Sequence, residues 1–182
     1  MTTCDSAVII VPEELLETAE TRHFEGTAAL DELAAGADAY RFAAPVAWSV
    51  DVTNTGGALL VMGRATATAA TQCARCLDEV SYDLEGDIEG YFIIGGDDAA
   101  APDDMEGDEF DYLPENRRID LVPLIEQALL LELPLVPLCD DDCQGLCPHC
   151  GANLNEGPCG CGGDEPGDDG PFAALKGLTF DN

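Results

Sequence analysis

The sequence contains very few basic residues. It has seven lysines and arginines against 37 aspartates and glutamates, a formal net charge of -30, and Lys176 is the single lysine. Proteins that hold nucleic acid without sequence preference use lysine and arginine to displace counterions from phosphates, and carboxylates oppose this binding. The composition therefore argues against autonomous, non-specific nucleic-acid binding and leaves a solvated acidic surface as the simplest interpretation.

Long apolar runs are also missing. Apolar runs such as residues 129–131 are far shorter than the roughly 20 residues that a membrane-spanning helix needs. Residues 1–5 lack the positive head and apolar stretch of a secretory signal. We expect a cytoplasmic protein without a membrane segment, and in that reducing compartment nine cysteines indicate metal ligands more than disulfides.

Alternation of apolar and polar residues predicts strands in the middle of the chain. Such alternation runs over 40–52 and again over 80–94, and residues 59–71 are rich in β-branched and small side chains. The stretch Asn-Thr-Gly-Gly at 54–57 is typical of a hairpin turn. We predict three consecutive antiparallel strands, preceded by a short strand at 7–11 and a helical turn after Pro12.

One helix is predicted after these strands. Asp120 can cap it, Pro134 and Pro137 end it, and apolar residues recur at three- and four-residue steps between them. These residues are Leu121, Leu124, Ile125, Ala128 and Leu129. The expected fold class is α+β, with a mainly antiparallel sheet, one packed apolar helix and a C-terminal cysteine-rich zinc module.

The expected organisation has three parts. Residues 1–138 form the α+β domain, with an exposed acidic loop at 95–109 that has too few apolar residues to order itself. Residues 139–161 form the zinc module packed on that domain. Residues 162–182 are a Gly/Asp linker followed by a short terminal helix.

Eight of the nine cysteines have spacings typical of a metal site. Two C-x-x-C pairs, at 73–76 and 147–150, can each bend into a knuckle that directs two sulfurs to one ion, and Gly151 can take the positive φ that such knuckles use. His149 is interpreted as a surface residue of the second knuckle. The candidate zinc ligands are Cys73, Cys76, Cys139, Cys143, Cys147, Cys150, Cys159 and Cys161.

Chain entropy favours one grouping of these cysteines over another. A site formed within about 15 residues costs less to close than one that spans sixty, so we prefer one zinc on Cys147, Cys150, Cys159 and Cys161 and a second on the remaining four. The cost of loop closure rises only logarithmically with length. A grouping in which the two C-x-x-C pairs share one ion therefore stays open.

The cysteines could also belong to either of two kinds of enzyme. A C-x-x-C pair can serve a thiol-disulfide oxidoreductase when a helix N-terminus lowers the thiol pKa, but Cys73 follows a predicted strand and Cys147 lies in a Gly/Pro-rich loop. Hydrolytic metal catalysis needs an open coordination position, which a four-cysteine site lacks. We therefore expect no catalytic centre, with the oxidoreductase as the alternative.

Several motifs together resemble one known family. They are Cys-Ala-Arg-Cys-Leu at 73–77, Leu-Pro-Leu-Val-Pro-Leu-Cys at 133–139, Cys-Gln-Gly-Leu-Cys-Pro at 143–148 and Cys-Gly-Ala-Asn-Leu-Asn at 150–155. In sequence and order these are similar to the YceD family. The resemblance implies a bacterial protein required for normal levels of large-subunit ribosomal RNA.

The resemblance and the charge together suggest how such a protein would act. An acidic surface attracts basic proteins, so the expected partners are ribosomal or ribosome-assembly proteins, with ribosomal RNA affected only indirectly. Arg64, Arg75, Arg117 and Arg118 could form one small basic spot for RNA, but ion pairs with nearby carboxylates are the preferred interpretation.

Overall fold

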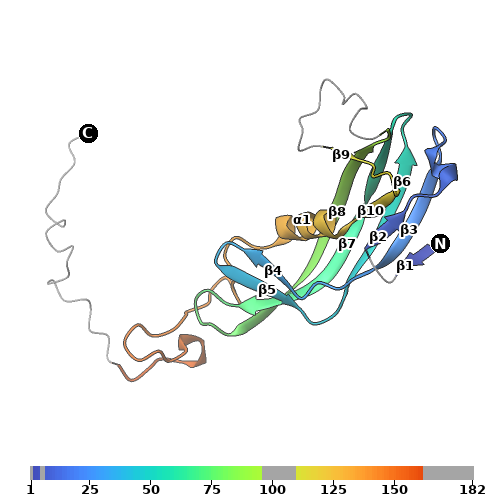
Figure 1. Ribbon diagram of the computed structural model, residues 1–182. Helices are drawn as coiled ribbons and strands as arrows, with labels where there is room; N and C mark the ends of the chain where they lie inside the picture. Colours follow the sequence, from blue (N-terminus) through green and yellow to red (C-terminus); the bar gives the residue numbers. More distant parts are fainter. Residues whose placement is uncertain (1, 5–6, 96–109, 162–182) are drawn as a thin grey trace, which may run out of the picture.

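The structure is a computed structural model, and it describes residues 2–4, 7–95 and 110–161 (Figure 1). In chain order the elements are β1 (Thr2–Cys4), β2 (Val8–Ile10), η1 (Glu13–Leu16), β3 (Thr21–Ala28), β4 (Glu32–Ala35), β5 (Asp38–Phe42), β6 (Val46–Asn54), β7 (Ala58–Gln72), β8 (Glu79–Ile93), β9 (Asp111–Tyr112), β10 (Arg118–Asp120), α1 (Val122–Glu132) and η3 (Leu154–Glu156). The expected acidic loop after Gly95 and the expected linker and helix at 162–182 lie outside the described residues.

A large, mainly antiparallel sheet forms the body of the protein. Its strand order is β1-β3-β6-β7-β5-β4, with β8 on the opposite side of β7 and β9 beside the end of β8. Among the described residues, only the β1–β3 and β8–β9 pairs are parallel. The three consecutive antiparallel strands predicted from the sequence are β6, β7 and β8, and they are confirmed.

Side-chain alternation explains why these strands form. In β6, Trp48 and Val50 are buried, whereas the residues that follow each of them, Ser49 and Asp51, are exposed. The β6–β7 turn places Gly56 at φ 99°, a value that favours glycine, and the side-chain oxygen of Asn54 accepts the Gly56 N–H at 2.8 Å. The turn predicted at 54–57 is therefore confirmed.

The sheet contains more strands than the sequence predicts, among them β1, β4 and β9. The alternating run at 40–52 is two strands, because the chain bends at residues 43–45 between β5 and β6, where Pro45 indicates an edge or a bend. Strand β3 was not predicted, although it pairs with β6 over its whole length. Only Phe24 and Ala28 of its eight residues are buried, so its sequence carries little apolar alternation.

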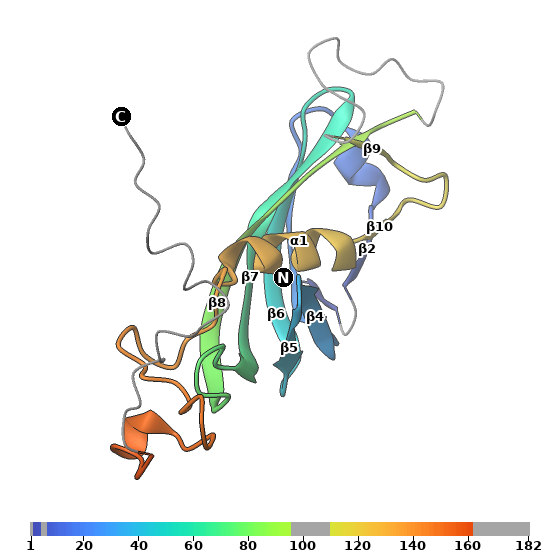
Figure 2. The same ribbon diagram turned by 90° about the vertical axis from the view of Figure 1, so that its left-hand side faces the viewer.

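The predicted helix is confirmed as α1, and it packs against β7 and β8. Figure 2 shows the helix crossing the strands. The prediction that Asp120 is the cap was wrong, because the N-cap position is held by Leu121; the Asp120 carboxylate, one residue earlier, accepts the Val122 N–H at 3.0 Å. Ile125, Ala128 and Leu129 are buried. No helix in the described part of the chain is long and apolar enough to cross a membrane.

The cysteine-rich segment, residues 139–161, lies at the far end of the sheet, beside the turn between β7 and β8 (Figures 1 and 2). It has little regular structure: the three-residue η3 and one antiparallel bridge between Leu146 and Asn153. Its contacts with the sheet include the Leu146 N–H bond to the Arg75 carbonyl and the Asn153 amide bond to Asp78.

Candidate metal centre

The first C-x-x-C pair forms the turn between β7 and β8. The turn is closed by two backbone hydrogen bonds, from the Leu77 N–H to the Cys73 carbonyl at 2.9 Å and from the Cys73 N–H to the Asp78 carbonyl at 2.8 Å. Leu77 has a φ of 65°, which is uncommon for a residue other than glycine. The backbone therefore turns sharply enough for Cys73 and Cys76 to face the same point.

The second C-x-x-C pair adopts the same backbone pattern. The Gly151 N–H donates to the Cys147 carbonyl at 2.9 Å, and the Cys147 N–H donates to the Ala152 carbonyl at 2.8 Å. Gly151 has a φ of 73°, as the sequence predicted, and it holds the position that Leu77 holds in the first pair. Two turns of the same design therefore occur in different parts of the chain.

Tyr82 helps to place Cys139, another candidate ligand, beside the first C-x-x-C pair. Its hydroxyl donates to the Leu138 carbonyl and accepts the Leu138 N–H, both at 2.8 Å, which fixes the residue just before Cys139. The Ala74 N–H also donates to the Pro137 carbonyl at 2.8 Å. Strand β8 thus fixes the chain that returns from α1.

Arg75 fixes the backbone at Cys143 in a similar way. Its guanidinium donates to the Asp141 carbonyl at 3.2 Å and to the Cys143 carbonyl at 3.0 Å. Gly145, with a φ of 74°, passes so close that an added Cβ would lie 3.1 Å from the Arg75 carbonyl oxygen. Arg75 was weighed from the sequence as part of an RNA-binding spot, but its contacts are within the cluster.

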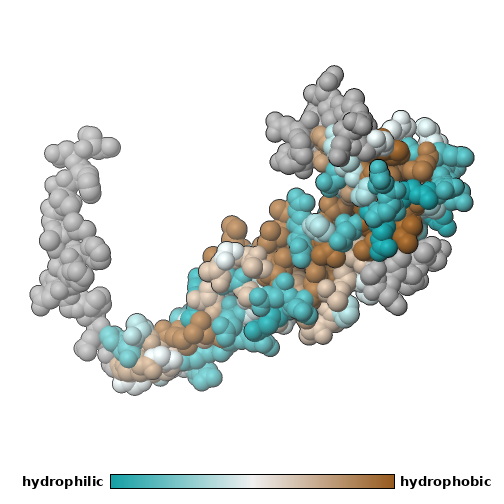
Figure 3. Space-filling view, in the orientation of Figure 1, coloured by the Kyte–Doolittle hydropathy of each residue, from teal (hydrophilic) through white to brown (hydrophobic). Residues whose placement is uncertain are grey.

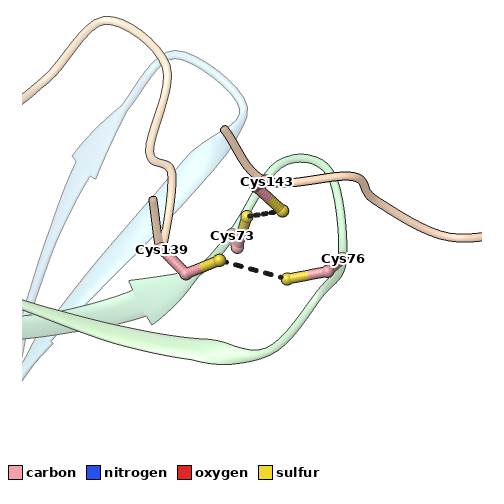
Figure 4. Close-up of side chains that lie close together, drawn as sticks. All are labelled: Cys73, Cys76, Cys139 and Cys143. Carbon is pink, nitrogen blue, oxygen red and sulfur yellow. Dashed lines mark hydrogen bonds between the residues drawn. The ribbon is translucent and has the colours of Figure 1, made fainter. Parts of the chain in front are cut away.

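Four sulfurs converge in the first cluster (Figure 4). The sulfur of Cys73 lies 3.8 Å from that of Cys143, and the sulfur of Cys76 lies 3.5 Å from that of Cys139. All four lie within 4.8 Å of one another. Cys139 is exposed, whereas the other three are buried.

The second cluster is local. It contains Cys147, Cys150, Cys159 and Cys161, whose sulfurs also lie within 4.8 Å of one another, with 3.3 Å between Cys147 and Cys159. The structure thus brings the eight cysteines together in the two groups that the loop-closure argument preferred. His149 belongs to neither group.

The donor sets fit a tetrahedral metal ion. With Zn–S bonds of about 2.3 Å, the edge of a regular tetrahedron of sulfurs is about 3.8 Å, close to the sulfur–sulfur distances of the first cluster. All eight cysteines are free thiols, so no disulfide competes for them. Four sulfurs around one ion also leave no open coordination position. Each cluster could therefore hold a metal ion in a closed site.

Hydrogen bonds to sulfur lower the pKa of three of the thiols. Burial alone raises the pKa of Cys73, but the backbone N–H groups of Cys76 and Arg75 outweigh it and lower this pKa to about 6. The N–H groups of Cys150 and His149 lower the pKa of Cys147 to about 6.

In the first cluster a side chain has the same effect. The Asn155 amide donates to the Cys143 sulfur at 3.3 Å and lowers the pKa of Cys143. Asn155 lies in η3, beside the second cluster in sequence, so this bond also connects the two clusters. Sequence reasoning did not single out Asn155, and its place in the Asn-Leu-Asn stretch at 153–155 was the available signal.

Neighbouring thiols show the opposite shift. Hydrogen bonds with Cys150, together with burial, raise the pKa of Cys161 to about 12. The bond with Cys143 raises the pKa of Cys139, and the bond with Cys147 raises that of Cys159. Sulfurs this close cannot all be anions unless a cation balances them, and a bound metal ion deprotonates its thiol ligands. The charge distribution therefore also suits a cation at each cluster.

Comparison with known proteins places the chain in a family. The family model described as "Large ribosomal RNA subunit accumulation protein YceD" matches residues 61–179, a range that includes both cysteine clusters. The chain belongs to the YceD family. No solved structure matches it.

The chain is also similar to individual curated proteins, two of which carry the YceD name. An uncharacterized protein of Mycobacterium tuberculosis is 36% identical over 107 residues, which are 59% of this chain and 50% of that protein. The Arabidopsis thaliana protein named "Large ribosomal RNA subunit accumulation protein YCED homolog 1, chloroplastic" is 29% identical over 157 residues, 72% of this chain and 49% of the relative. The Zea mays protein of the same name is 30% identical over 135 residues, which are 61% of this chain and 46% of that protein. The chain spans about half the length of the curated relatives it matches.

The Tyr82 hydroxyl gives a first testable prediction. Tyr82→Phe keeps the ring but leaves the N–H and carbonyl of Leu138 without their partner, so we expect the free energy of unfolding to fall by about 1–3 kcal/mol. Hydrogen exchange should speed up at the Leu138 amide and stay unchanged at the Gly151 amide of the second knuckle. Equal acceleration at both amides would contradict a local role for Tyr82.

Proposed function

We propose that this protein is a zinc-binding, non-enzymatic factor that supports the accumulation or stability of large-subunit ribosomal RNA during ribosome biogenesis, acting in the cytoplasm through a protein partner. The observation that carries the proposal is the YceD family match over residues 61–179. The plant relatives bear names that state the same role for them.

Zinc is the metal that the donor sets support best. Tetrahedral four-sulfur sites in proteins hold zinc or iron, and knuckles of the C-x-x-C type with nearby glycine are typical of structural zinc sites. A closed site of this kind stabilises a fold and offers no position for a substrate. The two clusters therefore favour a structural role for the metal and agree with a non-enzymatic function.

Action through a protein is supported by the distribution of charge. Three of the four arginines considered for an RNA-binding spot make contacts within the chain: Arg64 pairs with Glu85 at 2.8 Å, Arg117 pairs with Glu13 at 3.3 Å, and Arg75 donates to two backbone carbonyls. These ion pairs agree with the interpretation preferred from the sequence and leave little positive charge for phosphates. With a net charge of -30, the surface attracts basic proteins instead.

One observation favours the oxidoreductase alternative, namely the lowered pKa of Cys73 and Cys147. However, both sulfurs are buried, and neither C-x-x-C pair begins a helix in the described part of the chain. Each also faces sulfurs beyond its own pair. Metal analysis separates the two functions, since an oxidoreductase would carry no zinc and would exchange disulfides with a thiol substrate.

Deletion of the gene tests the proposed function. We expect a lower ratio of mature large-subunit to small-subunit ribosomal RNA, restored by the wild-type gene. A Cys76→Ser/Cys139→Ser gene should fail to restore it, because each substitution removes one sulfur of the first cluster. Cys4→Ser is the matched control, since Cys4 has no C-x-x-C partner in the sequence. Unchanged ribosomal RNA and subunit profiles in the deletion strain would overturn the proposal.

A further inference from the structure

Strand β8 has a long open edge. In the described ranges 2–4, 7–95 and 110–161, its only neighbour on the side away from β7 is β9, which pairs with Phe92 and Ile93. The remaining length, residues 79–91, has no strand beside it within those ranges. Figure 2 shows β8 at this margin of the sheet, with α1 crossing one face.

The direction of the main-chain groups along this edge follows from one hydrogen bond. The Leu113 N–H donates to the Ile93 carbonyl at 2.9 Å, so Ile93 presents its main-chain groups to the open side. Because this direction alternates along a strand, and the β7–β8 register is uninterrupted, every second residue before Ile93 does the same. These residues are Asp83, Glu85, Asp87, Glu89 and Tyr91.

Four of these residues are acidic, and their side chains form a row that we call the acidic row. Asp83, Glu85, Asp87 and Glu89 are exposed, on the face of β8 opposite α1. One arginine faces them: Arg64 lies 2.8 Å from Glu85 and 3.6 Å from Asp87. Negative charge therefore remains in excess where the strand offers its hydrogen bonds.

A groove lined by both polar and apolar residues lies beside the same edge. It encloses about 340 Å³ between β8 and α1, with Leu124, Ala128 and Leu131 on the helix side and Asp87, Glu89 and Glu132 at its rim. Leu131 is 80% exposed although it belongs to an apolar helix. Figure 3 shows apolar surface over the region of α1, bordered by hydrophilic residues.

We propose that the open edge of β8 binds an extended basic segment of a partner protein, which adds to the sheet as an antiparallel strand. Main-chain bonds to β8 would supply affinity, and alternate side chains would supply specificity. Side chains opposite the acidic row are lysine or arginine, because directly opposed residues lie about 5 Å apart. The intervening side chains are apolar and enter the groove beside Leu124 and Leu131.

The acidic row also selects against other occupants. Charged side chains on edge strands keep sheets from pairing with copies of themselves. A second copy of this chain would bring its own acidic row to the edge, whereas a basic strand neutralises it. The inference rests on the proposed function only for the existence of a partner, and the edge and groove are features of the structure.

A synthetic peptide tests the inference directly. The probe is a fluorescent peptide of alternating lysine and valine, about nine residues long, because residues 83–91 span about 30 Å. In an antiparallel pair the lysine N–H groups face β8, so methylation of the lysine backbone nitrogens should weaken binding at least about tenfold. Methylation of the valine nitrogens, which face away, is the matched control and should change affinity less than about twofold.

Protein variants locate the binding site. Glu89→Pro removes an N–H that points to the open edge and should weaken binding about tenfold while the β7–β8 pairing stays intact. Asp87→Asn/Glu89→Gln should weaken binding and reduce its salt dependence. Glu17→Gln/Glu32→Gln makes the same charge change on exposed residues outside β8 and should leave affinity unchanged.

The outcomes are decisive in either direction. Slower hydrogen exchange at the amides of Glu85, Asp87 and Glu89 upon peptide addition would support the proposal. Absence of binding, equal effects of both methylated peptides, or self-association of the protein that Glu89→Pro abolishes would overturn it. The assay contains no RNA and no cells, so its failure is distinct from failure of the proposed ribosomal function, which the deletion strain tests.

Discussion

Removal of zinc is expected to unfold residues 139–161 while the sheet stays folded. In this segment only Cys143, Gly145 and Cys147 are buried, and the regular structure is limited to η3 and one bridge. Structural zinc contributes on the order of 10 kcal/mol to the folding of small cysteine-rich modules, far more than these contacts can replace. Without the ion, the sulfurs would also lose the bonds that hold the two clusters together.

Hydrogen exchange with and without a zinc chelator measures this effect. The amides of Leu146, Cys147 and Leu154 donate backbone bonds within and beside the clusters, and they should lose their protection when zinc is removed. The amides of β6 and β7 should keep theirs. Full protection of residues 139–161 in protein shown to contain no metal would contradict the prediction.

A single substitution separates the two clusters. Cys150→Ser should release the second ion and retain the first, giving about one zinc per chain instead of about two. Cys4→Ser, the control outside the C-x-x-C pattern, should keep both. Loss of both ions in Cys150→Ser would show that the clusters do not form independently.

Gly86→Ala is expected to destabilise the protein strongly, because it disturbs the close contact between β8 and α1. A Cβ at Gly86 would lie 2.5 Å from the Ala128 carbonyl oxygen and 2.6 Å from its carbon, so the helix backbone would have to move. Forcing extra atoms into such a contact costs about 1–3 kcal/mol or more. We expect the free energy of unfolding to fall by about 3 kcal/mol in denaturant titrations.

Two other glycines provide matched controls. A Cβ at Gly90 would lie 2.8 Å from a Leu124 methyl group, which can rotate away, so Gly90→Ala should cost less than Gly86→Ala. A Cβ at Gly57 would meet nothing within 4 Å, and Gly57→Ala should be nearly neutral. If all three variants lost the same stability, the close approach of α1 to β8 would not be the cause.

The predictable parts of this structure are those with strong local signals. The alternation in β6 and β8, the turn at 54–57 and the apolar stripe of α1 each determine their own element, whatever the rest of the chain does. Strand β3 carries no such signal, because only two of its eight residues are buried and it forms by pairing with β6. Its existence depends on a partner that is distant in the sequence.

The same distinction applies to the candidate metal centre. Spacing predicted the two knuckles and the preferred grouping of cysteines, because local spacing governs the cost of closing each site. It did not predict Tyr82 or Asn155, whose roles depend on contacts with Leu138 and Cys143 that span 56 and 12 residues. The positive φ of Leu77 was also missed, since glycine is the usual signal for that conformation.

The first cluster joins parts of the chain that are 63 to 70 residues apart, the tip of the β7–β8 hairpin and the segment after α1. An ion there would act as a cross-link between these two parts of the chain. It would close a loop of the chain that contains α1. Loss of this ion would loosen the end of α1 that carries Leu131. The groove between that end and the edge of β8 would then widen. By thermodynamic reciprocity, a ligand that orders this edge would raise the affinity of the first cluster for its ion.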